Sequence, residues 1–127
     1  MRKKLTKAER IEIHGKYAGH CAYCGNEIEY KDMQVDHIRP QREWIECLVD
    51  GVDVNSIDNL NPSCRRCNHY KRSSSLETFR EMLKTLHERL RKQYLDKIAE
   101  DYGIIKIETW DGKFYFERVE VEDEKNS

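Results

Sequence analysis

Residues 21–24 read Cys-Ala-Tyr-Cys, and residues 64–67 read Cys-Arg-Arg-Cys. Each Cys-x-x-Cys pair can deliver two thiolates to the same side of a tetrahedral Zn²⁺ ion, at sulfur–zinc distances of ~2.3 Å. Two such pairs supply a complete set of ligands for one ion, namely Cys21, Cys24, Cys64 and Cys67. The sequence therefore predicts one structural zinc site, which closes the chain between its two Cys pairs.

The composition agrees with a small domain stabilised by a metal. The chain has 127 residues, 38% of them hydrophobic and 37% charged, which leaves a thin apolar core for a single domain of residues 1–127. A structural metal compensates for a thin core. Thiolate ligands, rather than disulfides, are typical of a reducing compartment, so we predict a cytoplasmic location. The fifth cysteine, Cys47, has no partner at a ligand spacing and is interpreted as a small packed hydrophobe.

Long apolar runs are absent from the sequence. A membrane-spanning helix needs about 20 mostly apolar residues, and a secretory signal needs an apolar stretch near the N-terminus. We therefore expect a soluble protein without a membrane partner.

The charged residues are unevenly distributed, although the net charge is only −1. Residues 61–75 contain bases and no acids, whereas the tail of residues 120–127 is acidic. A basic surface attracts polyanions, so the basic stretch is a candidate for contact with nucleic-acid phosphates. The alternative is a solvated face without a ligand. The candidate phosphate-binding residues are Arg39, Arg65, Arg66, Lys71 and Arg72.

The first half of the chain predicts short elements around the Cys pairs. Thr6 and Glu9 form a capping-box pattern, which predicts a helix over residues 7–18. An alternating stretch at residues 33–35 predicts a strand that runs into Asp36 and His37. A short helix is expected after Cys64, over residues 65–71.

The second half predicts a long helix and a hairpin. Apolar residues recur at steps of three and four from residue 76 to residue 98, which indicates one amphipathic helix over residues 76–100. This helix either folds over the metal core or forms a dimer seam, and the sequence leaves both open. Asp111 and Gly112 lie between β-rich runs, which predicts a hairpin over residues 104–119 before the acidic tail.

The segment between the Cys pairs contains residues suited to phosphodiester hydrolysis. This reaction needs an activated water, a cation that stabilises charge on the phosphate and a base that works near neutral pH. His37 is a candidate base because imidazole titrates near pH 6.5. Asp36 offers a carboxylate oxygen to Mg²⁺, and Asn68 offers a neutral oxygen to the same ion. Asn59 is a candidate to orient the imidazole or to order the loop around it.

Taken together, these motifs resemble the HNH endonuclease family in its zinc-stabilised, phage-like branch. The resemblance covers about residues 18–75 and is carried by four motifs in order. They are Cys21-x-x-Cys24, Val35-Asp36-His37-Ile38-x-Pro40, Asp58-Asn59-Leu60-x-Pro62 and Cys64-x-x-Cys67-Asn68-x-x-Lys71. The family implies an α+β fold with a ββα-metal core, here expected with an N-terminal helix before it. It also implies metal-dependent cleavage of DNA, usually double-stranded.

The resemblance also implies roles for single residues. His37 would be the general base, and Asn59 would position that side of the site. Asp36 and Asn68 would bind the catalytic cation, Mg²⁺ or Mn²⁺. His69 follows Asn68 but lies ~100° around the helix, so Asn68 is the preferred ligand. The cysteines would hold Zn²⁺ without taking part in the reaction.

Two other functions and the state of assembly stay open at this point. A zinc module that binds nucleic acid or protein without cutting would leave Asp36, His37 and Asn68 idle. A thiol oxidoreductase would use a Cys-x-x-Cys pair, but zinc would occupy both pairs. A homodimer or a partner protein is also compatible with the sequence.

Overall fold

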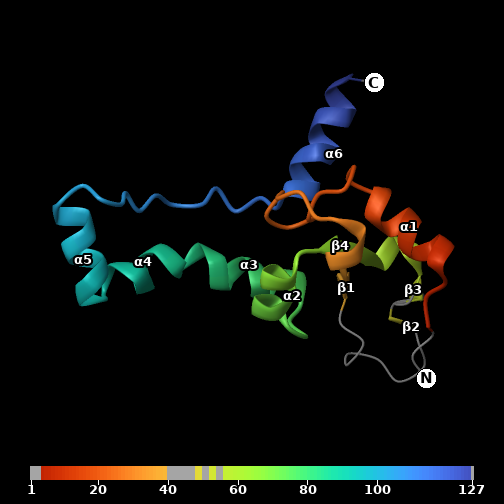
Figure 1. Ribbon diagram of the computed structural model, residues 1–127, viewed down its shortest axis with the longest axis horizontal. Coiled ribbons are helices and arrows are strands. Elements are labelled where there is room, and N and C mark those ends of the chain that lie inside the picture. Colours follow the sequence, from red (N-terminus) through yellow and green to blue (C-terminus); the bar gives the residue numbers. More distant parts are fainter. Residues whose placement is uncertain (1–3, 40–47, 50–51, 54–55, 127) are drawn as a thin grey trace. The chain divides into compact units, whose positions relative to one another are not determined.

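The computed structural model describes residues 4–39, 48–49, 52–53 and 56–126 (Figure 1). Pro40 and Cys47 lie outside the described residues. The fold is α+β, as predicted, and the chain divides into two compact units. The first unit comprises Met1–Leu76 with Phe114–Ser127, and the second comprises Glu77–Lys113. That residues 1–127 form a single domain stays a prediction.

The N-terminal helix α1 spans Lys7–Gly15. The predicted capping box is present, because the Glu9 amide donates to the Thr6 hydroxyl at 3.1 Å and the Thr6 amide donates to the Glu9 carboxylate at 3.0 Å. The helix ends before the predicted residue 18. The reason is the backbone at Ala18 and Gly19, which have φ angles of 52° and 79° and therefore turn the chain out of the helix toward the first Cys pair.

A small ββα arrangement forms the centre of the first unit. Strand β1, Gln34–His37, pairs antiparallel with strand β4, Leu60–Ser63, so that Asp36 lies opposite Asn61. Helix α2, Arg65–Lys71, follows β4 directly and packs against β1 (Figure 1). The predicted strand and the predicted short helix are thus confirmed. Because Asp36 and His37 are the last residues of β1, their backbone is fixed by the sheet.

Short elements complete this part of the unit. A 3-10 turn, η1, precedes β1 and a second, η3, precedes β4. A separate antiparallel pair, β2 with β3, lies in the connection between them. Their bounds are Tyr30–Asp32 for η1, Ile57–Asn59 for η3, Leu48–Val49 for β2 and Val52–Asp53 for β3.

The apolar core of the first unit is small, as the composition predicts. Ile13 of α1, Met33 and Leu60 form one buried cluster beside the sheet. Each contributes roughly 1.5–3 kcal/mol by its burial, so this cluster alone gives a modest hydrophobic stabilisation. The partly buried residues packed against it are Leu5, Ile28, Tyr30, Val35 and Ile57.

The loop of the first Cys pair is fastened to the sheet and to the C-terminal segment. The Ala22 amide donates to the Pro62 carbonyl of β4 at 2.9 Å, and the Phe116 amide donates to the Ala22 carbonyl at 2.8 Å. Gly25 closes the loop with a φ of 82°, and a Cβ there would lie 2.6 Å from the Tyr115 ring. A residue with a side chain would therefore disturb both the turn and the aromatic contact.

The second unit contains helices where one long helix was predicted. Most of residues 76–100 are helical, as expected, but they form separate helices: α3, Leu76–Lys84, α4, Leu86–Arg91, and α5, Tyr94–Asp101. The Thr85 hydroxyl bonds back to the Glu81 carbonyl at 3.1 Å, which favours a break after α3. Gln93 is extended, with a ψ of 133°, and separates α4 from α5. The prediction of one continuous helix over residues 76–100 is therefore wrong.

The predicted hairpin over residues 104–119 is not present. Residues 105–110 have no regular structure, and residues 115–119 belong to helix α6, Tyr115–Asn126, which also takes up most of the acidic tail. The Glu117 carboxylate accepts from the Phe114 amide at 2.9 Å and so caps α6. Phe114 and Phe116, from the second of the β-rich runs, are buried in the first unit, where they contact Tyr23.

The segment after α5 runs back along the helices of the second unit (Figure 1). The Arg91 guanidinium donates to the Ile107 carbonyl at 3.1 Å, and Arg80 donates to the Gly112 carbonyl. Within the described ranges, no helix is both long enough and apolar enough to cross a membrane.

Candidate functional site

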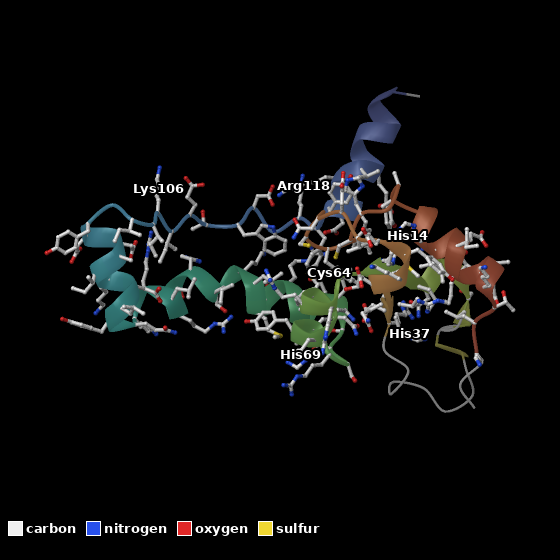
Figure 2. The ribbon with its side chains drawn as sticks, viewed as in Figure 1. His14, His37, Cys64, His69, Lys106 and Arg118 are labelled. Atoms are coloured by element: carbon white, nitrogen blue, oxygen red, sulfur yellow. The ribbon has the colours of Figure 1, made fainter. Side chains whose placement is uncertain are left out.

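The Cys pairs come together as predicted. The Sγ atoms of Cys21, Cys24, Cys64 and Cys67 all lie within 4.8 Å of one another, and those of Cys24 and Cys64 are 3.9 Å apart. A tetrahedron with zinc–sulfur bonds of 2.3 Å has sulfur atoms about 3.8 Å apart. The cluster, marked by Cys64 in Figure 2, therefore fits a structural Zn²⁺ ion in size and in ligand type.

The protonation of these thiols agrees with a shared cation site. Hydrogen bonds from Cys24 and Cys67 lower the pKa of Cys21. The bond to Cys21 raises the pKa of Cys24 to about 11, and contacts with Cys21 and Cys24 raise the pKa of Cys67 as well. One thiolate thus suppresses ionisation of its neighbours. All the thiols can ionise together only when a cation neutralises them.

His37 and Asn68 face the same cavity. The cavity has a volume of about 660 Å³, and its lining includes His37 from the end of β1 and Asn68 from α2. His69, also on α2, is exposed and is not among the residues that line this cavity (Figure 2). The preferred candidate, Asn68, is thus the α2 residue that the structure brings to the same space as the candidate base.

Asp36 is not among the residues that line this cavity and lies in a buried polar network. Its Oδ2 atom is 2.5 Å from the Tyr23 hydroxyl and 3.0 Å from the Lys71 ammonium. The Lys71 ammonium also donates to the His37 carbonyl at 3.0 Å. Asp36 is 5% exposed, Lys71 1% and Tyr23 4%. In the described part of the chain both contacts of the carboxylate go to Oδ2, which leaves Oδ1 as the oxygen available to a cation.

The network perturbs the phenol of Tyr23. Burial, together with the negative charge of Asp36 and the hydrogen bond to it, raises the pKa of Tyr23 well above its ordinary value. The phenol therefore stays protonated and acts as a permanent hydrogen-bond donor. The carboxylate charge is balanced by Lys71, as required for a buried ion pair.

Asn59 fixes the backbone just after β1. Its Oδ1 atom accepts from the Arg39 amide at 2.9 Å, and its Nδ2 atom donates to the Arg39 carbonyl at 3.1 Å. The Ile38 amide donates to the Asn59 carbonyl at 2.9 Å. The side chain thus orders the loop that leaves His37, which is the second of the two roles considered for it from the sequence.

The predicted phosphate-binding residues divide into two groups. Arg39, Arg65, Arg66 and Arg72 are exposed, as such a role requires. Lys71 is buried and bonded to Asp36 and His37, which does not match the surface contact with DNA that was predicted for it. Its place on the inner face of α2 turns its charge toward β1 and away from the solvent.

Sequence reasoning missed several residues of the site. Tyr23 lies inside the first Cys pair, and that position was read only as spacing between ligands. Lys4, Arg10 and Lys31 line the cavity with His37, although they come from the segment before α1, from α1 and from η1. No sequence pattern marked Arg10 as a residue of the site, because its place at the cavity depends on how α1 packs against the chain before β1. The same packing gives His14 a contact of 2.8 Å with the Ile28 carbonyl.

A protein-family model agrees with this geometry. The family model described as HNH endonuclease matches residues 21–74. A comparison with curated protein sequences finds no match. Among solved structures, the chain is similar to "Crystal structure of the Type II-C Cas9 enzyme from Actinomyces naeslundii", with 24% sequence identity and a TM-score of 0.48. That similarity covers 72% of this chain and 10% of the other, so this chain spans about a tenth of its length. The family match contains both Cys pairs and the segment between them, and residues 21–74 are thus similar to the HNH endonuclease family.

Proposed function

We propose that this protein is a metal-dependent endonuclease that hydrolyses phosphodiester bonds of DNA, with His37 as the general base. The observation that carries the proposal is the shared cavity of His37 and Asn68, with the buried Asp36 next to His37 in β1. A candidate base from β1 and an amide oxygen from α2 thus border one space large enough for part of a nucleotide strand.

Each residue has a definite part in the reaction. His37 takes a proton from the attacking water, and Asn59 keeps the backbone after His37 in place. Asp36 and Asn68 would bind Mg²⁺ or Mn²⁺, two ions that prefer oxygen ligands. When bound, this ion supplies positive charge to the phosphate oxygens and to the leaving oxygen. Zn²⁺ on the four cysteines keeps the first Cys pair and α2 together and takes no part in the reaction.

The substrate of the proposal is double-stranded DNA. Arg39, Arg65, Arg66 and Arg72 are exposed near the catalytic elements and are suited to contact phosphates next to the one being cut. Such contacts confer affinity without base information. A cytoplasmic location, and cleavage as a homodimer or with a partner protein, belong to the same proposal.

The test is cleavage of supercoiled plasmid by the zinc-loaded protein with Mg²⁺ or Mn²⁺. Wild type should nick or linearise the plasmid, and His37→Ala should lose this activity. His69→Ala is the matched control, because it removes an exposed imidazole from α2 and should leave cleavage unchanged. Zinc content and circular dichroism should be equal in all three proteins. An inactive wild type with normal zinc content, or an active His37→Ala variant, would contradict the proposal.

One observation favours a second function, a zinc module that binds nucleic acid without cutting it. The Lys71 ammonium already balances the charge of Asp36 at 3.0 Å, so the carboxylate has a partner without any divalent ion. In that case the protein would bind duplex DNA equally well with and without Mg²⁺. The plasmid assay separates the two functions, because the binding module shifts the plasmid on a gel but never changes its topology.

A further inference from the structure

The cavity in front of His37 has a basic wall that the HNH motif does not contain. Lys4, Arg10 and Lys31 line it, and none of the described residues that line it is acidic. Arg10 is held in place, since its guanidinium donates to the Met33 carbonyl at 3.4 Å and lies 5.7 Å from the centre of the Tyr30 ring. Lys31 is paired with Glu29 at 3.5 Å, but both side chains are largely exposed, so water weakens this pair.

These cations come from other elements than the bases of α2. Lys4 precedes α1, Arg10 is on α1 and Lys31 is in η1, and none of these elements belongs to the ββα arrangement. A strand of DNA carries a phosphate for every nucleotide, so a strand in the cavity would place phosphates on both sides of the one at His37. The wall supplies positive charge at the cavity itself, where the described lining contains no arginine of α2.

We propose that Lys4, Arg10 and Lys31 form a second phosphate-binding site for the DNA strand that enters the active site. This proposal rests on the proposed function, because it assigns the strand to the cavity of His37. It means that the strand runs from the bases of α2 past His37 to the wall formed by α1 and η1.

The salt dependence of DNA binding tests this proposal. Each phosphate contact adds about −0.9 to the slope of log K against log salt concentration on duplex DNA. The titration uses the full chain with His37→Ala, a fluorescent duplex and no added Mg²⁺, so that no DNA is cut. Replacing Lys4, Arg10 and Lys31 together by Gln should make the slope shallower by about two to three, and Lys4→Gln with Lys31→Gln by about two. The double variant Lys4→Gln with Lys31→Gln keeps the contacts of Arg10 with Met33 and Tyr30.

The matched control replaces Lys92, Lys97 and Lys106 by Gln, which removes the same charge from exposed positions of the second unit. Lys106 is paired with Glu108 at 3.4 Å, much as Lys31 is with Glu29. Equal slopes for the wall variant and the control would overturn the second phosphate site while leaving the endonuclease in place. A protein with the wild-type wall that does not bind duplex DNA would overturn the proposed function itself.

A second inference follows from an independent observation, the bond between Tyr23 and Asp36. Tyr23 lies between the zinc ligands Cys21 and Cys24, and its hydroxyl reaches Oδ2 of Asp36 at 2.5 Å. The Lys71 ammonium holds the same oxygen from α2. Two donors on Oδ2 stop the carboxylate from rotating, and Oδ1 keeps one orientation. Partners of this kind tune the affinity of a ligand for its metal.

We propose that Tyr23 is a positioning residue, which couples the zinc site to the catalytic carboxylate. Without its hydroxyl, the carboxylate would turn both oxygens toward Lys71 and would lose the orientation in which Oδ1 is available. This inference also rests on the proposed function, because Asp36 is taken as the ligand of the catalytic ion.

The test compares Tyr23→Phe with Tyr115→Phe. Tyr115 packs on Gly25 of the same Cys loop, so its phenol is a matched control on the zinc side of the site. Mn²⁺ binding to each full chain, loaded with zinc, is measured by the electron paramagnetic resonance signal of free Mn²⁺. Tyr23→Phe should raise the dissociation constant about tenfold, and should lower kcat without changing KM for plasmid. Tyr115→Phe should match wild type in both respects, and Asp36→Asn should abolish this binding.

Zinc content and the absorption spectrum of the cobalt-substituted protein show whether the Cys site is intact. Unchanged Mn²⁺ affinity in Tyr23→Phe, or loss of zinc from this variant, would overturn the positioning role. A wild type that binds Mn²⁺ through Asp36 but leaves plasmid intact would instead contradict the proposed function, and the effect of Tyr23 on Mn²⁺ affinity would still stand.

Discussion

The hydroxyl of Tyr23 lies 2.5 Å from Oδ2 of Asp36, and so the Cys-x-x-Cys loop touches the carboxylate at the end of β1. The contact joins the loop of the first Cys pair to the strand that ends in the candidate catalytic residues. The loop contains two of the four cysteines that could hold a metal ion, and the Ala22 amide bonds it to the Pro62 carbonyl of β4. The strand is fixed by its pairing with β4. Both therefore share β4 as a support, and this common support holds the phenol and the carboxylate at a fixed separation.

The raised pKa of Tyr23 makes a prediction for alkaline stability. In the unfolded chain this phenol ionises near pH 10, whereas burial and Asp36 hold its pKa in the folded protein well above that. The contribution of the buried phenol to the free energy of unfolding is therefore complete below pH 10. It is lost as the pH rises toward the pKa of the phenol in the folded protein. Urea unfolding at pH 9 and pH 11 should show a smaller loss of stability for Tyr23→Phe than for wild type. Tyr115→Phe should lose as much stability between the two pH values as wild type. An equal loss in all three proteins would contradict the burial of the Tyr23 phenol.

The ion pair between Lys71 and Asp36 makes a prediction for stability at neutral pH. Lys71→Met keeps most of the side-chain volume but leaves a buried carboxylate without its cation, which costs about 3–5 kcal/mol when one partner of a buried pair is removed. The free energy of unfolding in urea measures this loss. The double variant Lys71→Met with Asp36→Asn should recover part of it, because the buried charge is gone. A single variant as stable as wild type would show that Lys71 is not buried in solution.

Several parts of the fold could be read from the sequence because the signal was local. The capping box of Thr6 and Glu9 and the Cys spacing depend on neighbouring residues alone, and both are present as predicted. The orientation of Lys71 depends instead on the packing of α2 against β1. A basic residue within a basic stretch gave no sign that it faces inward.

The predicted hairpin was wrong because two different structures share one pattern. Phe114 and Phe116 belong to an aromatic run that favours a strand, but here both rings pack on Tyr23 while the chain begins a helix. The sequence also contained the opposing signal, since Glu117 lies three residues after Phe114 and caps α6. The contacts with Tyr23, from a distant part of the sequence, bury both rings without a strand partner in the described residues.

The placement of Phe114 makes a third prediction. This side chain is 1% exposed and meets the Tyr23 ring edge-on, with centroids 5.4 Å apart. Phe114→Ala should lower the free energy of unfolding by about 3–5 kcal/mol, because it removes a buried aromatic ring from a small core. Tyr102→Ala removes an exposed ring and should change it by less than about 0.5 kcal/mol. A small effect for Phe114→Ala would contradict the docking of the C-terminal segment on the Cys loop.

The thiols make a prediction for zinc binding. At pH 7 the raised pKa values of Cys24 and Cys67 keep both protonated in the absence of metal. Zinc binding must therefore release roughly two or more protons, and the affinity for zinc must fall as the pH is lowered. Calorimetric titration with Zn²⁺ in buffers of different ionisation enthalpy counts the protons. An enthalpy that is the same in every buffer would exclude thiol ligands.

Asn59 makes the last prediction, which separates the order of the loop from the chemistry of His37. Its amide accepts from and donates to the backbone of Arg39, so Asn59→Asp keeps the acceptor and loses the donor, whereas Asn59→Ala loses both. Each lost bond leaves a partly buried backbone group unpaired, at a cost of about 1–3 kcal/mol. Stability should therefore fall in the order wild type, Asp variant, Ala variant. Plasmid cleavage should fall in the same order, because the loop after His37 loses its fixed conformation.

If Asn59 acted on the imidazole and not on the loop, the pH dependence of cleavage would shift in both variants while their stability stayed at the wild-type value. The observed bonds to Arg39 predict the opposite, a lower rate and a lower stability with an unchanged pH profile.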